Sequence, residues 1–219
     1  MTGGQRQRRD GSRATRLVTP AMGALAVGAV FGAVTSLVNA LSGHFADLES
    51  REATTSGVSP LEVISVLLDS DWAWAGLAVA TGWLVTRTEQ NPRAALATGA
   101  AAGALALIAA TTAYSVVDTI RGAGAAHWCQ SEPFFWWVAG VVFGPPLGAI
   151  GACIKRPTLT GLLARLTVPV GAAAQMLVLP PGRNNTITTI GQAVVWTAAA
   201  ASIVFAVSHF FNVKRRLTS

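Results

Sequence analysis

The chain has 219 residues, 52% hydrophobic and only 12% charged, whereas soluble domains carry roughly 25% charged residues. This composition does not describe a soluble domain, and it leaves room for little beyond membrane spans of about 20 apolar residues each. The net charge of +6 comes mainly from basic residues beside apolar segments, where they orient helices and meet anionic lipid. We therefore expect one all-α membrane domain in contact with the bilayer and no nucleic-acid partner.

The chain begins with 16 polar, arginine-rich residues, which predict a disordered cytoplasmic tail. The apolar run from about Leu17 to Leu41 is too long for the core of a cleaved signal peptide, so we expect a retained first span. An acidic segment, His44–Ser59, follows it on the outer side. Pro60 favours the first turn of a short helix, Leu61–Leu68, lying on the outer surface.

Five further spans complete the predicted six-helix domain of residues 17–213. They cover about Trp72–Val85, Ala94–Val117, Phe134–Ile154, Thr158–Leu179 and Ile187–Phe211. The first of these five is short, and it reaches full length only if Asp69 and Asp71 lie at its outer mouth. Residues 214–219 form a basic C-terminus.

The charged residues divide between the two sides of the membrane that these spans define. One side receives 12 of the 16 basic residues: Arg6, Arg8, Arg9, Arg13, Arg16, Arg87, Arg93, Lys155, Arg156, Lys214, Arg215 and Arg216. The other side receives 8 of the 10 acidic residues: Asp47, Glu49, Glu52, Glu62, Asp69, Asp71, Asp118 and Glu132. Because Lys and Arg accumulate in cytoplasmic loops, this pattern predicts that both termini are cytoplasmic.

Three of the spans carry glycines four residues apart: Gly28 with Gly32, Gly99 with Gly103, and Gly140 with Gly144 and Gly148. Small residues at this spacing let membrane helices approach closely. We expect these three spans, the first, third and fourth, to form the core of the bundle. Dimerisation through one of them is the alternative.

The fourth span also contains Pro145 and Pro146, which donate no backbone hydrogen bond. They predict either a packing kink or a broken helix that lines a cavity, as in many transporters. Ala26–Gly32 resembles Val138–Gly144, with four identical positions of seven. The match is either an inverted repeat of three spans or a product of the Ala-, Gly- and Val-rich composition.

The strongest candidate for chemistry is the pair Asp69 and Asp71 at the outer mouth of the second span. Two close carboxylates repel each other when both are ionised, so one of them can retain a proton, as a general acid or a proton-coupled carrier needs. The alternative is a pair of solvated loop acids. Asp118 and Glu132 are weaker catalytic candidates, and the simplest role of Asp118 is an ion pair with Arg121.

Seven tryptophans are many for this length, and most map to the outer half of the predicted bundle. The interfacial aromatic belt explains tryptophan at either surface, but the inner surface offers only Trp83. This asymmetry predicts an aromatic-lined outer cavity, which would attract cations. Its expected residues are Trp72, Trp74, Trp128, Trp136, Trp137, Tyr114, Pro145 and Pro146.

Two segments, Trp72–Gly82 and Val138–Ala152, resemble the corresponding segments of small multi-pass actinobacterial membrane proteins, the family with domain of unknown function 6518. Tyr114, near the outer end of the third span, also fits that family. The resemblance covers about half of the chain. An acidic residue expected in the fifth span is absent, and Gln175 stands nearby instead. The resemblance implies the bacterial plasma membrane and no assigned activity.

These features leave three functions open. The first is a carrier or binding protein for a small hydrophobic or cationic molecule. The second is a membrane-embedded cyclase of an isoprenoid, in which Asp69 or Asp71 protonates the substrate and tryptophans shelter the carbocation. The third is a structural subunit of a larger membrane complex. The two cysteines form no metal-binding pattern with histidine, so we expect no metal site and no cofactor.

Overall fold

The computed structural model describes residues 3–48, 59–121, 131–180 and 185–218. Its helices, in chain order, are α1 (Gly3–Leu48), α3 (Pro60–Leu68), α4 (Asp71–Thr86), α5 (Pro92–Ile120), α6 (Ser131–Cys153), α7 (Leu159–Val178) and α8 (Asn185–Thr218). These ranges contain no strand, which confirms the predicted all-α class. Five helices are long and apolar enough to cross a membrane, and α3 with α4 could form a sixth, bent span. The helices therefore have the character of a multi-pass membrane protein.

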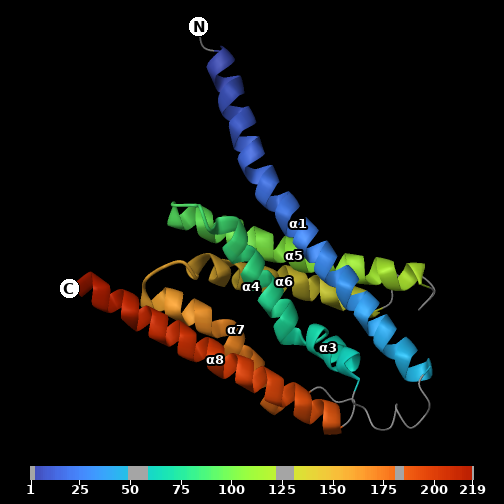
Figure 1. Cartoon of the computed structure of the whole chain (residues 1–219). Helices are drawn as coiled ribbons and strands as arrows, with labels where there is room; N and C mark the ends of the chain where they lie inside the picture. The colour runs from blue at the N-terminus through green and yellow to red at the C-terminus, as the bar shows by residue number, and fades with distance from the viewer. Residues whose placement is uncertain (1–2, 49–58, 122–130, 181–184, 219) are drawn as a thin grey trace.

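Helix α1 is longer than the predicted first span. Its apolar part, Val18–Ser42, closely matches the prediction. However, the helix begins at Gly3 and so continues through the arginine-rich stretch for which the sequence predicts disorder. Gln and Arg are good helix formers, and they extend a helix that is already nucleated. In Figure 1 this N-terminal part of α1 projects away from the other helices.

Helix α5 packs between α1 and α6, and glycines permit both contacts. A Cβ atom on Gly28 or Gly32 of α1 would overlap the backbone of α5 at Ala106 or Ala110. On the other side, a Cβ on Gly148 would lie 2.9 Å from the Cα of Gly103. The close approach of these backbones confirms the predicted glycine contacts of the first, third and fourth spans. The buried core also includes Leu77 and Ala78 of α4.

Helices α3 and α4 meet at a bend of 61°. Ser70, between them, has an extended backbone (φ −78°, ψ 145°) and forms the N-cap of α4. Helix α3, which corresponds to the predicted short helix Leu61–Leu68, packs against α1 and α8 and buries Ser65 completely. The interruption therefore falls between α3 and α4. Helix α6, by contrast, continues through Pro145 and Pro146 without a break.

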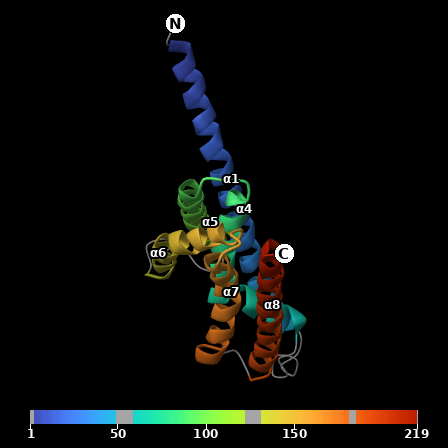
Figure 2. The ribbon, with the colours of Figure 1, turned by 90° about the vertical axis from the view of Figure 1, so that its left-hand side faces the viewer.

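Helices α7 and α8 form a hairpin and run side by side in both views (Figures 1 and 2). One end of the bundle contains the turns at residues 87–91 and 154–158 and the C-terminal end of α8 (Figure 1). We call it the basic end, because Arg87, Arg93 and Arg156 lie in or beside these turns. The C-terminal ends of α1 and α5 lie at the opposite, acidic end, with Asp118 (Figure 1). The described charges thus follow the predicted division.

Candidate functional site

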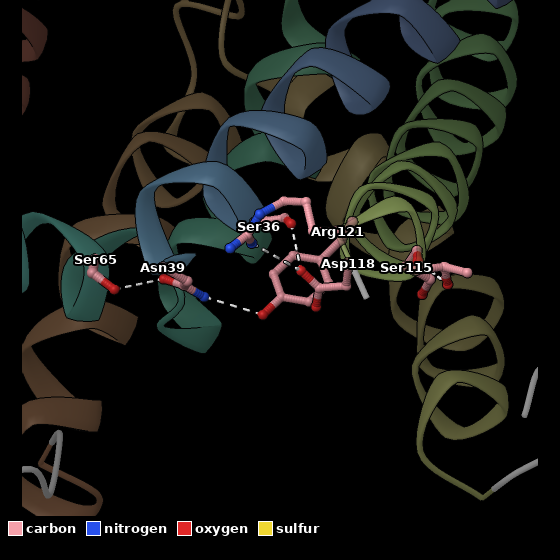
Figure 3. A network of polar contacts seen from close by, with 8 residues as sticks. Ser36, Asn39, Ser65, Ser115, Asp118 and Arg121 are labelled. Carbon is pink, nitrogen blue, oxygen red and sulfur yellow. Dashed lines mark hydrogen bonds and ion pairs between the residues drawn. The ribbon is translucent and has the colours of Figure 1, made fainter. Parts of the chain in front are cut away.

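Asn39 of α1 joins three helices by hydrogen bonds in the half of the bundle toward the acidic end (Figure 3). Its Oδ1 accepts from Oγ of Ser65 in α3 at 2.6 Å. Its Nδ2 donates to the hydroxyl oxygen of Tyr114 in α5 at 3.1 Å. Both ends of the amide are therefore engaged, which fixes the orientation of the side chain. Polar groups within a membrane bundle are costly unless they are paired, and here the pairs link α1, α3 and α5.

A second polar contact lies beside the first (Figure 3). Oγ of Ser36, which is completely buried, donates to Oδ1 of Asp118 at 2.6 Å. The same oxygen lies 3.9 Å from Nη1 of Arg121, which confirms the predicted ion pair. Both charged side chains are about one-third exposed, so the ion pair by itself contributes little stability. Since Ser36 and Asn39 are three residues apart, they share one face of α1.

Trp74 connects this polar network to the apolar core. Its ring lies 5.5 Å from that of Phe31 in an edge-on arrangement and 6.4 Å from that of Tyr114. It also packs against the buried cluster that includes Leu77 and Ala106. Tyr114 thus contacts Trp74 through its ring and Asn39 through its hydroxyl group. Two of the predicted cavity residues, Trp74 and Tyr114, are therefore brought together.

A third polar contact holds the start of α4. The first amides of a helix have no acceptor within the helix. Ser70 does not supply one with its side chain, because its Oγ donates to the carbonyl oxygen of Leu67 at 2.5 Å. Instead, Oε1 of Gln175 in α7 accepts from the amide of Trp72 at 3.0 Å. Nε2 of Gln175 donates to Oδ2 of Asp71 at 3.2 Å.

The two carboxylates at the bend have different surroundings. Asp71 is exposed, bonded to Gln175, and placed in the first turn of α4, where a negative charge interacts favourably with the helix dipole. Asp69 is exposed and ends α3, and its backbone amide donates to the carbonyl oxygen of Ser65. The structure therefore places both predicted acids at the break between α3 and α4.

The other predicted cavity residues that the structure describes lie on α4 and α6. Trp72 lies two residues before Trp74, about 200° around the helix, and packs against Ala172, Met176 and Val195. Trp136 is exposed and lies beside Phe135. Two others, Trp137 and Pro145, are partly buried, whereas Pro146 is exposed. Trp128 and the side chain of Glu132 lie outside the described residues.

The sequence reasoning missed Ser36, Asn39 and Ser65. A signal was present, because a polar amide in an apolar span is itself a reason to expect a function or a bonded partner. Nε2 of Gln192 in α8 donates to the carbonyl oxygen of Met176 in α7 and so links the two helices of the hairpin. Among the described residues, no three His, Cys, Asp or Glu side chains lie close enough to hold a metal ion.

No family model, curated protein or solved structure matches this chain. Its function is therefore inferred from its geometry.

Proposed function

We propose that this chain is a multi-pass protein of the bacterial plasma membrane that binds and carries a small cationic or hydrophobic molecule. We further propose that both termini are cytoplasmic and that the chain belongs to the actinobacterial family it resembles. The observation that carries the binding proposal is the 61° bend between α3 and α4, which has two carboxylates at the break.

Interrupted spans bind substrates in many transporters, because the unwound residues present polar groups within the membrane. Here the interruption brings Asp69, Ser70 and Asp71 together between two helices. Both acids are exposed rather than covered by neighbouring helices. Two negative groups at one site favour a cation, and the adjoining apolar helices favour a hydrophobic one.

The bend is held from both sides by different helices. The hydrogen bond from Ser65 to Asn39 ties α3 to α1, which packs closely on α5. Gln175 ties the first turn of α4 to α7. A movement of the α7–α8 hairpin against α1, α5 and α6 would therefore change the geometry at the two carboxylates. Such rocking of one group of helices against another is how many carriers expose a site to alternate sides.

The geometry favours a carrier over a cyclase. A general acid for carbocation chemistry would face a water-excluding aromatic surface. Asp71 is instead exposed and bonded to Gln175, while Trp74 packs against Phe31 in the core. No described contact favours the structural-subunit alternative.

The proposal is tested by equilibrium dialysis of the purified protein in detergent with two probes, tetraphenylphosphonium (a hydrophobic cation) and N-phenyl-1-naphthylamine (neutral). We expect saturable binding of the cation. The double variant Asp69→Asn with Asp71→Asn should weaken it by about tenfold or more, the size of one lost charge interaction. Glu62→Gln removes an acid from the same half of the bundle, outside the bend, and should change binding by less than about twofold.

Saturable binding of the neutral probe alone, weakened by the double variant, would narrow the ligand to uncharged hydrophobic molecules. Absence of saturable binding for both probes would overturn the proposal. So would equal effects of the double variant and Glu62→Gln.

A further inference from the structure

A groove of about 450 Å³ lies between α1 and α4 at the basic end of the bundle. Its residues include Pro20, Gly23 and Val27 from α1, with Thr81, Leu84 and Arg87 from α4 and the turn after it. The groove is far along α4 from Asp69 and Asp71. It takes no part in the proposed carrier site.

The groove exists because α1 leaves the bundle at this end. At Gly28 and Gly32 the backbone of α1 contacts α5 so closely that a Cβ would overlap it. At Gly23, one and a half turns earlier, a Cβ would meet no atom within 4 Å. In Figure 1, α1 diverges from the other helices toward its N-terminus. The space is thus built into the path of the helix.

The surface of the groove changes from apolar to cationic along its length. Val27 and Leu84 supply apolar walls. Thr81 is 1% exposed, and within the described residues its hydroxyl has no hydrogen-bond partner. Arg87 lies exposed at the mouth and forms no ion pair with a described carboxylate. The nearest acid in sequence, Glu89, uses its Oε1 to accept from the amide of Asn91 at 2.9 Å.

The spacing of these groups corresponds to the layers of a lipid leaflet. Thr81 and Arg87 are six residues apart, about 9 Å along a helix. The polar interfacial layer of a bilayer is about 5–8 Å deep on each side. When Arg87 lies at the level of the phosphate groups, Thr81 therefore lies just below the interfacial layer, beside the first part of the acyl chains.

We propose that this groove is a binding site for one anionic phospholipid. The guanidinium of Arg87 binds the phosphate, which it matches with paired hydrogen bonds. One acyl chain lies along Val27 and Leu84. Basic pockets between helices on the cytoplasmic side are a recurrent means of holding anionic headgroups. The other basic residues at this end, such as Arg93, favour the same lipids without selecting this groove.

The test measures lipid binding by native mass spectrometry of the full chain in detergent, with dioctanoyl-phosphatidylglycerol and dioctanoyl-phosphatidylcholine as probes. Arg87→Gln should raise the Kd for phosphatidylglycerol about tenfold and leave phosphatidylcholine within about twofold, whereas Arg87→Lys should retain most of the affinity. The matched control is Arg93→Gln, an exposed arginine at the same end but outside the groove. It should change either Kd by less than about twofold.

A second pair of variants tests the groove itself. Gly23→Leu adds a side chain to the groove at a position where a Cβ meets no atom within 4 Å, and it should weaken binding of both lipids about tenfold. Gly171→Leu in α7 is the matched control, because a Cβ there also meets no atom within 4 Å, and it should have no effect. Equal effects of Arg87→Gln and Arg93→Gln, or unchanged binding in Gly23→Leu, would overturn the proposal. Binding of glycerol phosphate as tight as the lipid would assign the site to free phosphate. A protein dimer lost in Gly23→Leu would assign the groove to a second copy.

Discussion

Asn39 is the residue on which the polar network depends, because it connects side chains from α3 and α5 through opposite ends of one amide. Such contacts between membrane helices are modest individually, about 0.6 kcal/mol on average and up to about 1.7 kcal/mol. Their value is specificity, because an amide facing the wrong helix would lose both partners. Gln175 has the same character at the start of α4.

A double-mutant cycle with Asn39→Leu and Tyr114→Phe should give a coupling energy of about 0.6–1.7 kcal/mol. Each change removes one side of the hydrogen bond from Nδ2 of Asn39 to the Tyr114 hydroxyl. The measurement is reversible unfolding in mixed micelles of dodecylmaltoside and sodium dodecyl sulfate. Thr197→Val in α8, whose hydroxyl bonds only within its own helix, should show no coupling to Tyr114→Phe. A coupling energy near zero for Asn39 would contradict the network.

At the scale of the helices, glycine determines which backbones touch. Gly148 of α6 lies against Gly99 and Gly103 of α5, and Gly151 lies against α4. Because the atoms in contact are backbone atoms, they cannot rotate away from an added methyl group. Gly171 of α7 has the same sequence context, an apolar helix, but open space around it.

Gly148→Ala should therefore destabilise the protein by about 1–3 kcal/mol or more, the usual cost of overpacking. Gly171→Ala should be neutral or slightly stabilising, since alanine has the higher helix propensity by up to about 1 kcal/mol. Thermal unfolding of both variants in dodecylmaltoside gives the comparison. A Gly148→Ala protein as stable as the Gly171→Ala protein would show that α5 and α6 are not in backbone contact.

At the scale of the whole molecule, the charges define a direction. Arg87, Arg93, Lys155 and Arg156 lie in or beside the turns of the basic end. Lys155 also binds the carbonyl oxygens of Thr86 and Glu89, so a cation stabilises the C-terminal end of α4. Lys155 thus serves both helix capping and the expected cytoplasmic orientation.

This orientation predicts the outcome of cysteine labelling in intact bacterial cells. With Cys129 replaced by Ser, Glu62→Cys should react with a membrane-impermeant maleimide. Thr88→Cys should react only after the cells are permeabilised, because its turn faces the cytoplasm in the proposed orientation. Cys153 is buried and serves as the unlabelled background. If Thr88→Cys reacted in intact cells and Glu62→Cys reacted only after permeabilisation, the proposed topology would be the wrong way round.

The positions of the helices and the limits of their apolar parts follow from local sequence. A span depends on the average apolarity of about 20 consecutive residues, and a glycine contact face depends on spacing within one helix. Both are properties of a single segment. For this reason the limits of the spans and the importance of Gly28, Gly103 and Gly148 could be read before any contact was known. The Asp118–Arg121 ion pair could be predicted in the same way, because the two residues are about one helical turn apart.

The site itself depends on partners that are distant in sequence. Asn39 meets Tyr114 across 75 positions, and Asp71 meets Gln175 across 104. Nothing in either local segment specifies these partners, because each is selected by how whole helices pack. For a related reason, the sequence did not determine where the helices are interrupted. Proline is tolerated in a span when neighbours satisfy the freed carbonyls, so α6 continues through Pro145 and Pro146.

The sequence alone thus determined an all-helical membrane chain, its spans, its close-packing glycines and the division of its charges, since all of these arise from composition and spacing over one or two helices. Only the tertiary structure decided that the chain bends between α3 and α4 at Asp69–Asp71, that Asn39 and Gln175 hold that bend from opposite sides, and that α1 diverges to form a groove beside Arg87. These depend on the packing of several helices at once, and a side chain acquires its partner only when that packing is complete.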